Sequence, residues 1–119
     1  MGLFDVTTTA LDVALRGAEL RQTALSNNLA NVNTPGFKRS DVTFEDALAS
    51  ALSGTQDDVA SVEPSIVAGT GTAMRADGNN VDADSEAASL AQTQIVFDSL
   101  MAIDSKRLRS LSSLITSAR

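Results

Sequence analysis

Apolar residues near the N-terminus recur every seven positions, at Phe4, Leu11, Ala18, Leu25 and Val32. A stripe this narrow is typical of a helix that meets a partner helix rather than a broad core. We expect the helix to run from about Asp5 to Asn33, with Asp5 and a capping box at Thr9 as equal candidates for its start. Thr34-Pro35-Gly36 ends it, because the residue before a proline avoids the helical region and Pro-Gly favours a turn.

A second and longer pattern occupies the C-terminal end, where positions from 83 to 118 alternate steps of four and three residues. Gln94 and Asp104 are its two polar members; the apolar members are Ala83, Ala87, Leu90, Phe97, Met101, Leu108, Leu111, Ile115 and Ala118. Residues 82–119 contain no proline or glycine, and all of their acidic residues precede all of the basic ones, as the helix dipole favours. The pattern predicts a coiled-coil-like helix over 82–119.

The middle of the chain loses this periodicity. Residues 34–52 are predicted to form a loop followed by a short amphipathic turn, and residues 53–81, rich in Ser, Thr, Asp and Gly, a flexible loop. Ile66 and Val67 could form a short β-hairpin within it. With 119 residues, the chain has length for one domain only.

The predicted C-terminal helix is too long for a globular domain of this size. At 1.5 Å per residue it would be about 55 Å long, whereas a compact chain of this length has a radius of gyration of about 13.5 Å. The monomer should therefore be elongated, and its narrow apolar stripes need more partners than one N-terminal helix supplies. We expect a subunit of a larger assembly.

Composition excludes most catalytic and metal chemistry. The chain has no His, Cys, Trp or Tyr, and its 9 Lys and Arg against 15 Asp and Glu give a formal charge of −6. Thiol and His-assisted nucleophiles, the usual zinc sites and disulfides are thus excluded, and nucleic acid is an improbable partner. We predict no catalytic residue, metal ligand or cofactor. No cleavable secretory signal and no lipid-inserting segment are predicted.

Three polar motifs have ordinary structural explanations beside functional ones. The cluster Asn27, Asn28, Asn31 and Asn33 is either a frayed, solvated helix end or a set of hydrogen-bonding groups for a neighbouring subunit. The run Asp77–Asp84 fails as a calcium loop, since Val81 occupies the fifth ligand position, and a turn into a helix N-cap is favoured. Lys38 and Arg39 are predicted to be a solvated pair.

The stretch Leu25-Ser26-Asn27-Asn28-Leu29-Ala30-Asn31-Val32-Asn33-Thr34-Pro35-Gly36-Phe37-Lys38-Arg39 resembles the N-terminal signature of the bacterial flagellar axial proteins of rod and hook. Within that family, Arg75-Ala76-Asp77-Gly78-Asn79-Asn80-Val81-Asp82 followed by Glu86 resembles the proximal rod members. The short chain agrees, since distal rod and hook subunits carry a large inserted domain. The resemblance covers both ends of the chain but not the middle.

The resemblance implies a mainly α fold, in which two long terminal helices pack as an antiparallel coiled-coil-like pair around an irregular middle segment. It implies a structural subunit that self-associates helically into the periplasmic rod of the flagellar basal body and transmits torque for motility. It further implies export by the flagellar type III apparatus without a cleaved signal peptide, with Phe44 and Leu48 as the export motif. The implied partners are other rod proteins, the membrane-ring adaptor and the export apparatus.

The site residues expected on these grounds fall into two further groups. The axial signature comprises Asn27, Asn28, Asn31, Asn33, Thr34, Pro35, Gly36 and Phe37. The assembly seam, which we expect to be covered only on assembly, comprises Leu11, Leu25, Leu29, Leu90, Phe97, Met101, Leu108, Leu111 and Ile115. Two alternatives stay open: another small proximal axial rod protein, and a cytoplasmic helical adaptor or secretion chaperone that dimerises through the C-terminal seam. An enzyme is a remote fourth possibility.

Overall fold

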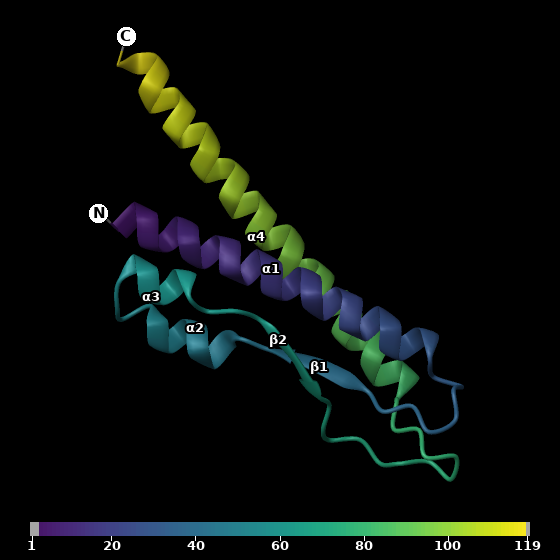
Figure 1. The fold of residues 1–119 in the computed structure, drawn as a ribbon. Coiled ribbons are helices and arrows are strands. Elements are labelled where there is room, and N and C mark those ends of the chain that lie inside the picture. Colours follow the sequence, from purple (N-terminus) through teal and green to yellow (C-terminus); the bar gives the residue numbers. More distant parts are fainter. Residues whose placement is uncertain (1–2, 119) are drawn as a thin grey trace.

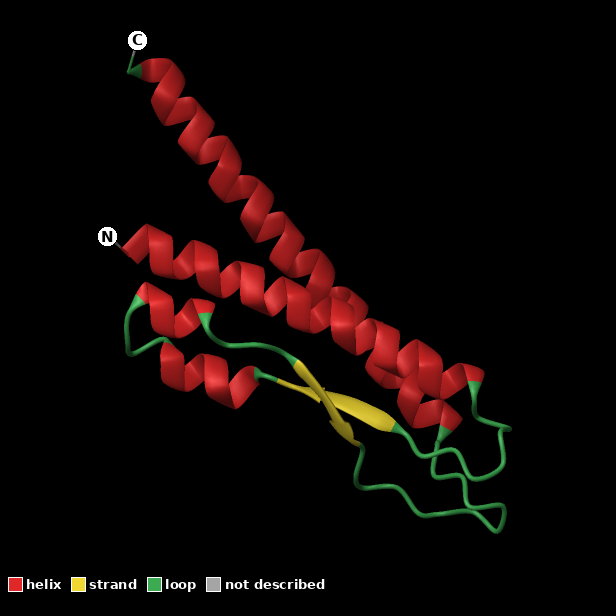
Figure 2. Cartoon of the chain, viewed as in Figure 1, coloured by secondary structure: helices red, strands yellow, loops and turns green. Residues whose placement is uncertain are grey.

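A computed structural model of the protein describes residues 3–118, which form four helices and one two-stranded sheet. In chain order the elements are α1 (Leu3–Ala30), β1 (Ser40–Thr43), α2 (Glu45–Ala51), α3 (Gln56–Ala60), β2 (Ser65–Ala68) and α4 (Ala83–Ser117). Helix α1 is central, with α4 on one side and the sheet and short helices on the other (Figures 1 and 2).

The two long helices run antiparallel and are in contact, as predicted (Figure 1). They pack most closely where α1 ends and α4 begins, and they diverge toward the N- and C-termini of the chain. The chain has a radius of gyration of 18.1 Å and extents of 67 × 26 × 15 Å, so the predicted elongated shape is confirmed.

Both ends of α1 differ from the sequence-based prediction. The helix begins at Leu3, before either predicted cap, and the Thr9 hydroxyl donates to the Asp5 carbonyl within the helix. It ends at Ala30 rather than Asn33. The backbone carbonyls of Asn31 and Val32 instead accept hydrogen bonds from the side chain of Asn79, in the loop before α4. Helix α4 matches its prediction closely: Asp82 caps it by accepting from the amides of Asp84 and Ser85.

The middle segment is more structured than its composition suggests. The helix α3 starts with a capping box, in which Thr55 and Asp58 satisfy each other's backbone amides. The strand β2 pairs antiparallel with β1, and Ile66 and Val67 lie opposite Val42 and Asp41. The short antiparallel strand pair expected in the middle segment is thus confirmed, but the partner of Ile66 and Val67 is β1, which precedes α2 and α3 and lies outside residues 53–81.

The core lies between α1 and the β1–α2 segment. Its buried cluster consists of Val13, Ala24, Val42, Phe44 and Val62. A Cβ atom added to Gly17 of α1 would lie 2.3 Å from the Phe44 ring, so only glycine lets this ring lie so close to the helix. The distance between α1 and the β1–α2 junction, which carries Phe44, therefore depends on glycine at position 17.

Candidate assembly interface

The signature stretch and α4 meet at a group of four residues that we call the hub: Asn28 and Glu86, which are buried, and Arg39 and Ser40, which are half-buried. Asn28 is 0% and Glu86 1% exposed. The Asn28 amide donates to the Ser40 carbonyl at 2.8 Å and to Glu86 Oε2 at 2.9 Å, and its oxygen accepts from the Ser40 amide at 3.0 Å. Arg39 Nε donates to Glu86 Oε1 at 2.5 Å. The side-chain amide of Asn28 and both carboxylate oxygens of Glu86 thus have partners, as burial requires.

The prediction that Lys38 and Arg39 form a solvated pair is wrong for Arg39. Its side chain is only 10% exposed and forms an ion pair with Glu86. Lys38 is exposed but donates to the Gly78 carbonyl. The sequence held one signal for the ion pair: Glu86 follows the Arg75–Asp82 stretch in the family resemblance, though nothing local connects it with Arg39.

A second buried asparagine, Asn79, closes the end of α1. Its side-chain amide donates to the carbonyls of Asn31 and Thr34, both at 2.9 Å, and of Val32 at 3.2 Å. Its oxygen accepts from the Val81 amide at 2.7 Å. Carbonyls at a helix end have no partner within the helix, and Asn79 supplies one. The predicted turn into the N-cap of α4 is confirmed. Asn79 of this turn, however, hydrogen-bonds to the end of α1 rather than to α4.

Glycines let the loops that follow α1 and precede α4 lie against each other. Gly36 and Gly78 have φ values of +76° and +84°, and the Gly36 amide donates to the Asp77 carbonyl at 2.8 Å. Arg75 donates to the carbonyls of Val81 and Val32 and so joins both loops. The two motifs that carry the family resemblance therefore form one contiguous unit.

The signature residues separate into an inward and an outward set. Asn28 is buried, whereas Asn31 and Phe37 are half-buried. A frayed, solvated helix end is therefore the wrong description of Asn28, whose partners belong to its own chain. The outward set is Asn27, Asn33, Thr34, Pro35 and Gly36.

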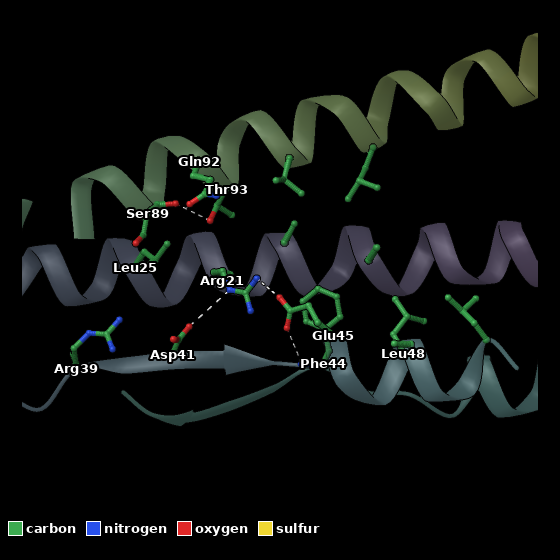
Figure 3. Close-up of a pocket in the computed structure, with 16 residues that line it drawn as sticks. Arg21, Leu25, Arg39, Asp41, Phe44, Glu45, Leu48, Ser89, Gln92 and Thr93 are labelled. Carbon is green, nitrogen blue, oxygen red and sulfur yellow. Dashed lines mark hydrogen bonds and ion pairs between the residues drawn. The ribbon is translucent and has the colours of Figure 1, made fainter. Parts of the chain in front are cut away.

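Arg21 of α1 contacts the residues at the start of α2. It donates to the Val42 carbonyl at 2.6 Å and pairs with Glu45, and its guanidinium carbon lies 5.4 Å from the centre of the Phe44 ring (Figure 3). Burial acts to raise the pKa of the Glu45 carboxyl, but the hydrogen bond and charge of Arg21, with backbone hydrogen bonds, outweigh it and lower that pKa.

An open groove of about 650 Å³ runs along α1 between α2 and α4, shown in Figure 3. Ala14, Ala18 and Leu25 of α1 contribute to it, together with Leu48 of α2, Leu52 directly after α2, and Val96 and Leu100 of α4. Charged groups from Arg21, Arg39, Asp41 and Glu45 also line it. The groove is mainly apolar and wide enough to take side chains of another protein segment.

The predicted assembly-seam residues do not share one environment. Leu11 and Leu25 are buried within the single chain, so the expectation that they are covered only on assembly is wrong for these two. Leu29, Leu90 and Phe97 are half-buried. Met101, Leu108, Leu111 and Ile115 are exposed, together with Ile103 and Leu114. The side chain of Phe4, which begins the seven-residue pattern, lies outside the described residues.

The two residues of the predicted export motif have a structural role in the folded chain. Phe44 is buried in the core and Leu48 packs against it half-buried. Their amphipathic spacing is explained by this packing, so any role in export would be exercised by an unfolded chain.

Residues 3–118 contain no group of three or more acidic, His or Cys side chains that could hold a metal ion. No helix of that part is long and apolar enough to cross a membrane.

Comparison with known proteins identifies the family of this sequence. A family described as flagella basal body rod protein matches residues 11–38, which include most of the signature. The chain is 34% identical to the flagellar basal body rod protein FlgB of Bacillus subtilis over 100% of both chains. It is 31% identical to FlgB of Borrelia hermsii, over 97% of this chain and 99% of that protein. With similarity over the full length of its relatives, the chain belongs to the FlgB family of flagellar basal body rod proteins.

Proposed function

We propose that this protein is a structural subunit of the proximal part of the flagellar rod, where copies of it and of neighbouring rod proteins form a helical shaft that transmits torque for motility. One observation carries the proposal: the C-terminal half of α4 presents Leu108, Leu111 and Ile115 to solvent in a chain of the FlgB family. Rod proteins of this family are structural and not enzymes.

The shape of the chain suits such a shaft. A stripe on one part of the surface that docks onto a different part of the next copy makes a heterologous contact, which generates open helical assemblies. The hub ties the two long helices together near one end through buried hydrogen bonds, and torque applied to one helix would pass to the other through it. In this proposal the exposed members of the assembly seam and of the signature contact neighbours.

The finer partners are part of the same proposal. Beyond other rod proteins, we infer contacts with the membrane-ring adaptor and passage through the flagellar type III export apparatus without a cleaved signal. Phe44 and Leu48 would be recognised before folding, while they are still accessible. Secretion of Phe44→Ala, compared with the core control Val59→Ala, checks this role: loss in the first and not the second is expected, and equal secretion contradicts it.

The rod function is tested in a flagellated bacterium whose own gene is replaced by variants of this one. Leu111→Asp with Ile115→Asp should abolish swimming and remove the protein from purified basal bodies, because two charges cannot be buried in an apolar contact. The control is Ser110→Asp with Ser113→Asp, both on the polar side of α4. Normal motility of the leucine and isoleucine variant would contradict the proposal.

The same experiment separates the two alternatives from this function. A cytoplasmic adaptor or secretion chaperone would be absent from purified basal bodies. Another small proximal axial protein would fail to restore swimming when the FlgB-family gene alone is deleted.

A further inference from the structure

We propose that the apolar stripe at the end of α4 docks into the groove between α2 and α4 of a second copy of this chain. The stripe consists of Leu108, Leu111, Leu114 and Ile115, and the groove is the one beside Leu48 and Leu52. This inference rests on the proposed function and names the surface that each copy offers to the next.

The stripe continues the face of α4 that packs on α1. Along that face lie Glu86, Leu90, Thr93 and Phe97, which are buried or half-buried. Further along, Leu108, Leu111, Leu114 and Ile115 are 60%, 45%, 65% and 65% exposed. Positions 108, 111 and 115 have the i, i+3, i+7 spacing by which a helix enters an apolar groove.

The groove is built to receive a helix. Its floor on α1 contains Ala14 and Ala18, small residues one helical turn apart that leave room for an approaching helix. Its walls carry two exposed apolar residues, Leu52 at the C-cap of α2 and Val96 of α4.

The occupant cannot be the stripe of the same chain. Ser89, Thr93, Val96 and Leu100 of α4 line the groove, and α4 then continues without a break to Ser117. At 1.5 Å per residue, Leu111 lies about 16 Å beyond Leu100 along the helix axis. A straight helix that forms one wall of the groove cannot also turn back into it, so the stripe must enter another molecule.

The lining of the groove is balanced in charge, with Arg21 and Arg39 against Asp41 and Glu45, but the surroundings of the groove favour a second copy as that molecule. Residues 104–118 contain Lys106, Arg107 and Arg109 against Asp104 alone. Residues 40–74 have no Lys or Arg and contain six acidic residues, Asp41, Glu45, Asp46, Asp57, Asp58 and Glu63. Helix α2, which lines the groove, begins with Glu45 and Asp46, and α3 with Asp57 and Asp58 lies next to α2 (Figure 1), whereas the stripe is flanked by basic residues. Opposite charges on docking surfaces favour the correct pairing over like-to-like contacts.

Cysteine cross-linking tests this docking directly, because the chain contains no Cys. A flagellated strain is made to produce two variants together, one with Leu108→Cys, Leu111→Cys or Ile115→Cys and one with Leu52→Cys. Basal bodies are then isolated and mildly oxidised. A disulfide forms only where Cα atoms come within about 7 Å. We expect a dimer between a stripe variant and the Leu52→Cys variant, and none when either is produced alone.

One control variant and a set of charge-reversal variants make the result more specific. Ser113→Cys lies about 200° around α4 from Leu111 and should give no dimer with Leu52→Cys. Reversal of charge by Lys106→Glu and Arg109→Glu should lower the dimer yield about two- to fivefold for each residue, and Asp46→Lys with Asp57→Lys should restore part of it. Circular dichroism of each purified variant checks that it is folded.

The outcomes distinguish the docking from the rod function. Swimming cells whose basal bodies contain the protein, but give only stripe-to-stripe dimers or no dimers, would overturn the docking and leave the rod function in place. Absence of the unmodified protein from basal bodies would overturn both.

Discussion

Glu86 is the residue on which the packing of the two chain ends depends most. Its two carboxylate oxygens have different partners, the amide of Asn28 and the guanidinium of Arg39. A carboxylate taken out of water this completely is tolerated only when its partners replace the lost hydration. Removing one member leaves the others buried without a partner, which costs more than the pair itself contributes.

Glu86→Gln should therefore destabilise the fold by about 3 kcal/mol, since it leaves the Arg39 charge without a counter-ion. Urea unfolding followed by circular dichroism measures this. The control Glu19→Gln changes an exposed carboxylate of α1 and should alter stability by less than about 0.5 kcal/mol. The double variant Arg39→Met with Glu86→Met should lose less than the two single variants together; strict additivity would argue against a coupled pair.

Glu45 gives the protein a pH dependence of defined sign. Its pKa is lowered from 4.5 in the folded chain, so the carboxylate stabilises the fold above about that pH. This stability is lost as the pH falls through the lower folded value. Since its side chain is 52% exposed, we expect less than about 1 kcal/mol from the contact. Urea midpoints measured from pH 6 down to pH 3 should fall less steeply for Glu45→Gln than for the natural chain. A parallel fall would contradict the contribution of Arg21; Asp46→Asn is the control.

At the scale of elements, the contact between α1 and the β1–α2 junction depends on a missing side chain. Gly17 lies opposite the Phe44 ring in the middle of a long helix, where glycine is intrinsically unfavourable by about 1 kcal/mol. Its presence there is explained by the close approach of the ring.

Gly17→Ala should consequently destabilise the protein by about 1–3 kcal/mol, despite the better helix propensity of alanine, because the ring and backbone must shift. Combining it with Phe44→Leu, which removes the crowded ring atoms, should give a variant more stable than the sum of the two single effects predicts. Thermal unfolding of the three variants measures this, and a stabilised Gly17→Ala chain would refute the close approach.

The elements that could be predicted from sequence are those that depend on local pattern. The α4 pattern extends over most of the helix, and α4 was expected within a residue or two of Ala83–Ser117. The pairing of Val42 with Ile66 was not predictable, because β2 is exposed along its length and shows no alternation of apolar and polar residues. The partner of Arg39 lies 47 residues away, and burial of a basic residue depends on that partner and not on its neighbours. The candidate groove was missed for the same reason, since its lining comes from three helices and the first strand.

At the scale of the whole molecule, the two long helices are well packed at one end of the molecule, whereas α4 is exposed at the other. The hub, the Asn79 contacts and the core lie along α1, whereas the last turns of α4 carry exposed leucines and the helices diverge there (Figure 2). A helix with few buried contacts opens locally more easily than one packed on both sides.

Amide hydrogen exchange of the dilute monomer should show this difference. Amides of residues 105–117 should exchange at least tenfold faster than those of residues 86–97, which pack on α1. In assembled rods the two segments should become similarly protected, if the stripe is then covered. Uniform protection of α4 in the dilute monomer would mean that its exposed half is stable without neighbours.

The hub can form only late in synthesis, because it joins residues that are far apart in the sequence. A ribosome delivers the N-terminus first, so Asn28, Arg39 and Ser40 appear long before Glu86, and Asn79 also comes late. Until about three quarters of the residues have been made, Asn28 and Arg39 lack the carboxylate that satisfies them, and the end of α1 lacks its cap. Synthesis thus leaves the nascent protein without its closing contacts for most of its elongation. In the proposed export of an unfolded chain, contacts that form only after most of the sequence has been made would keep the chain unfolded for longer.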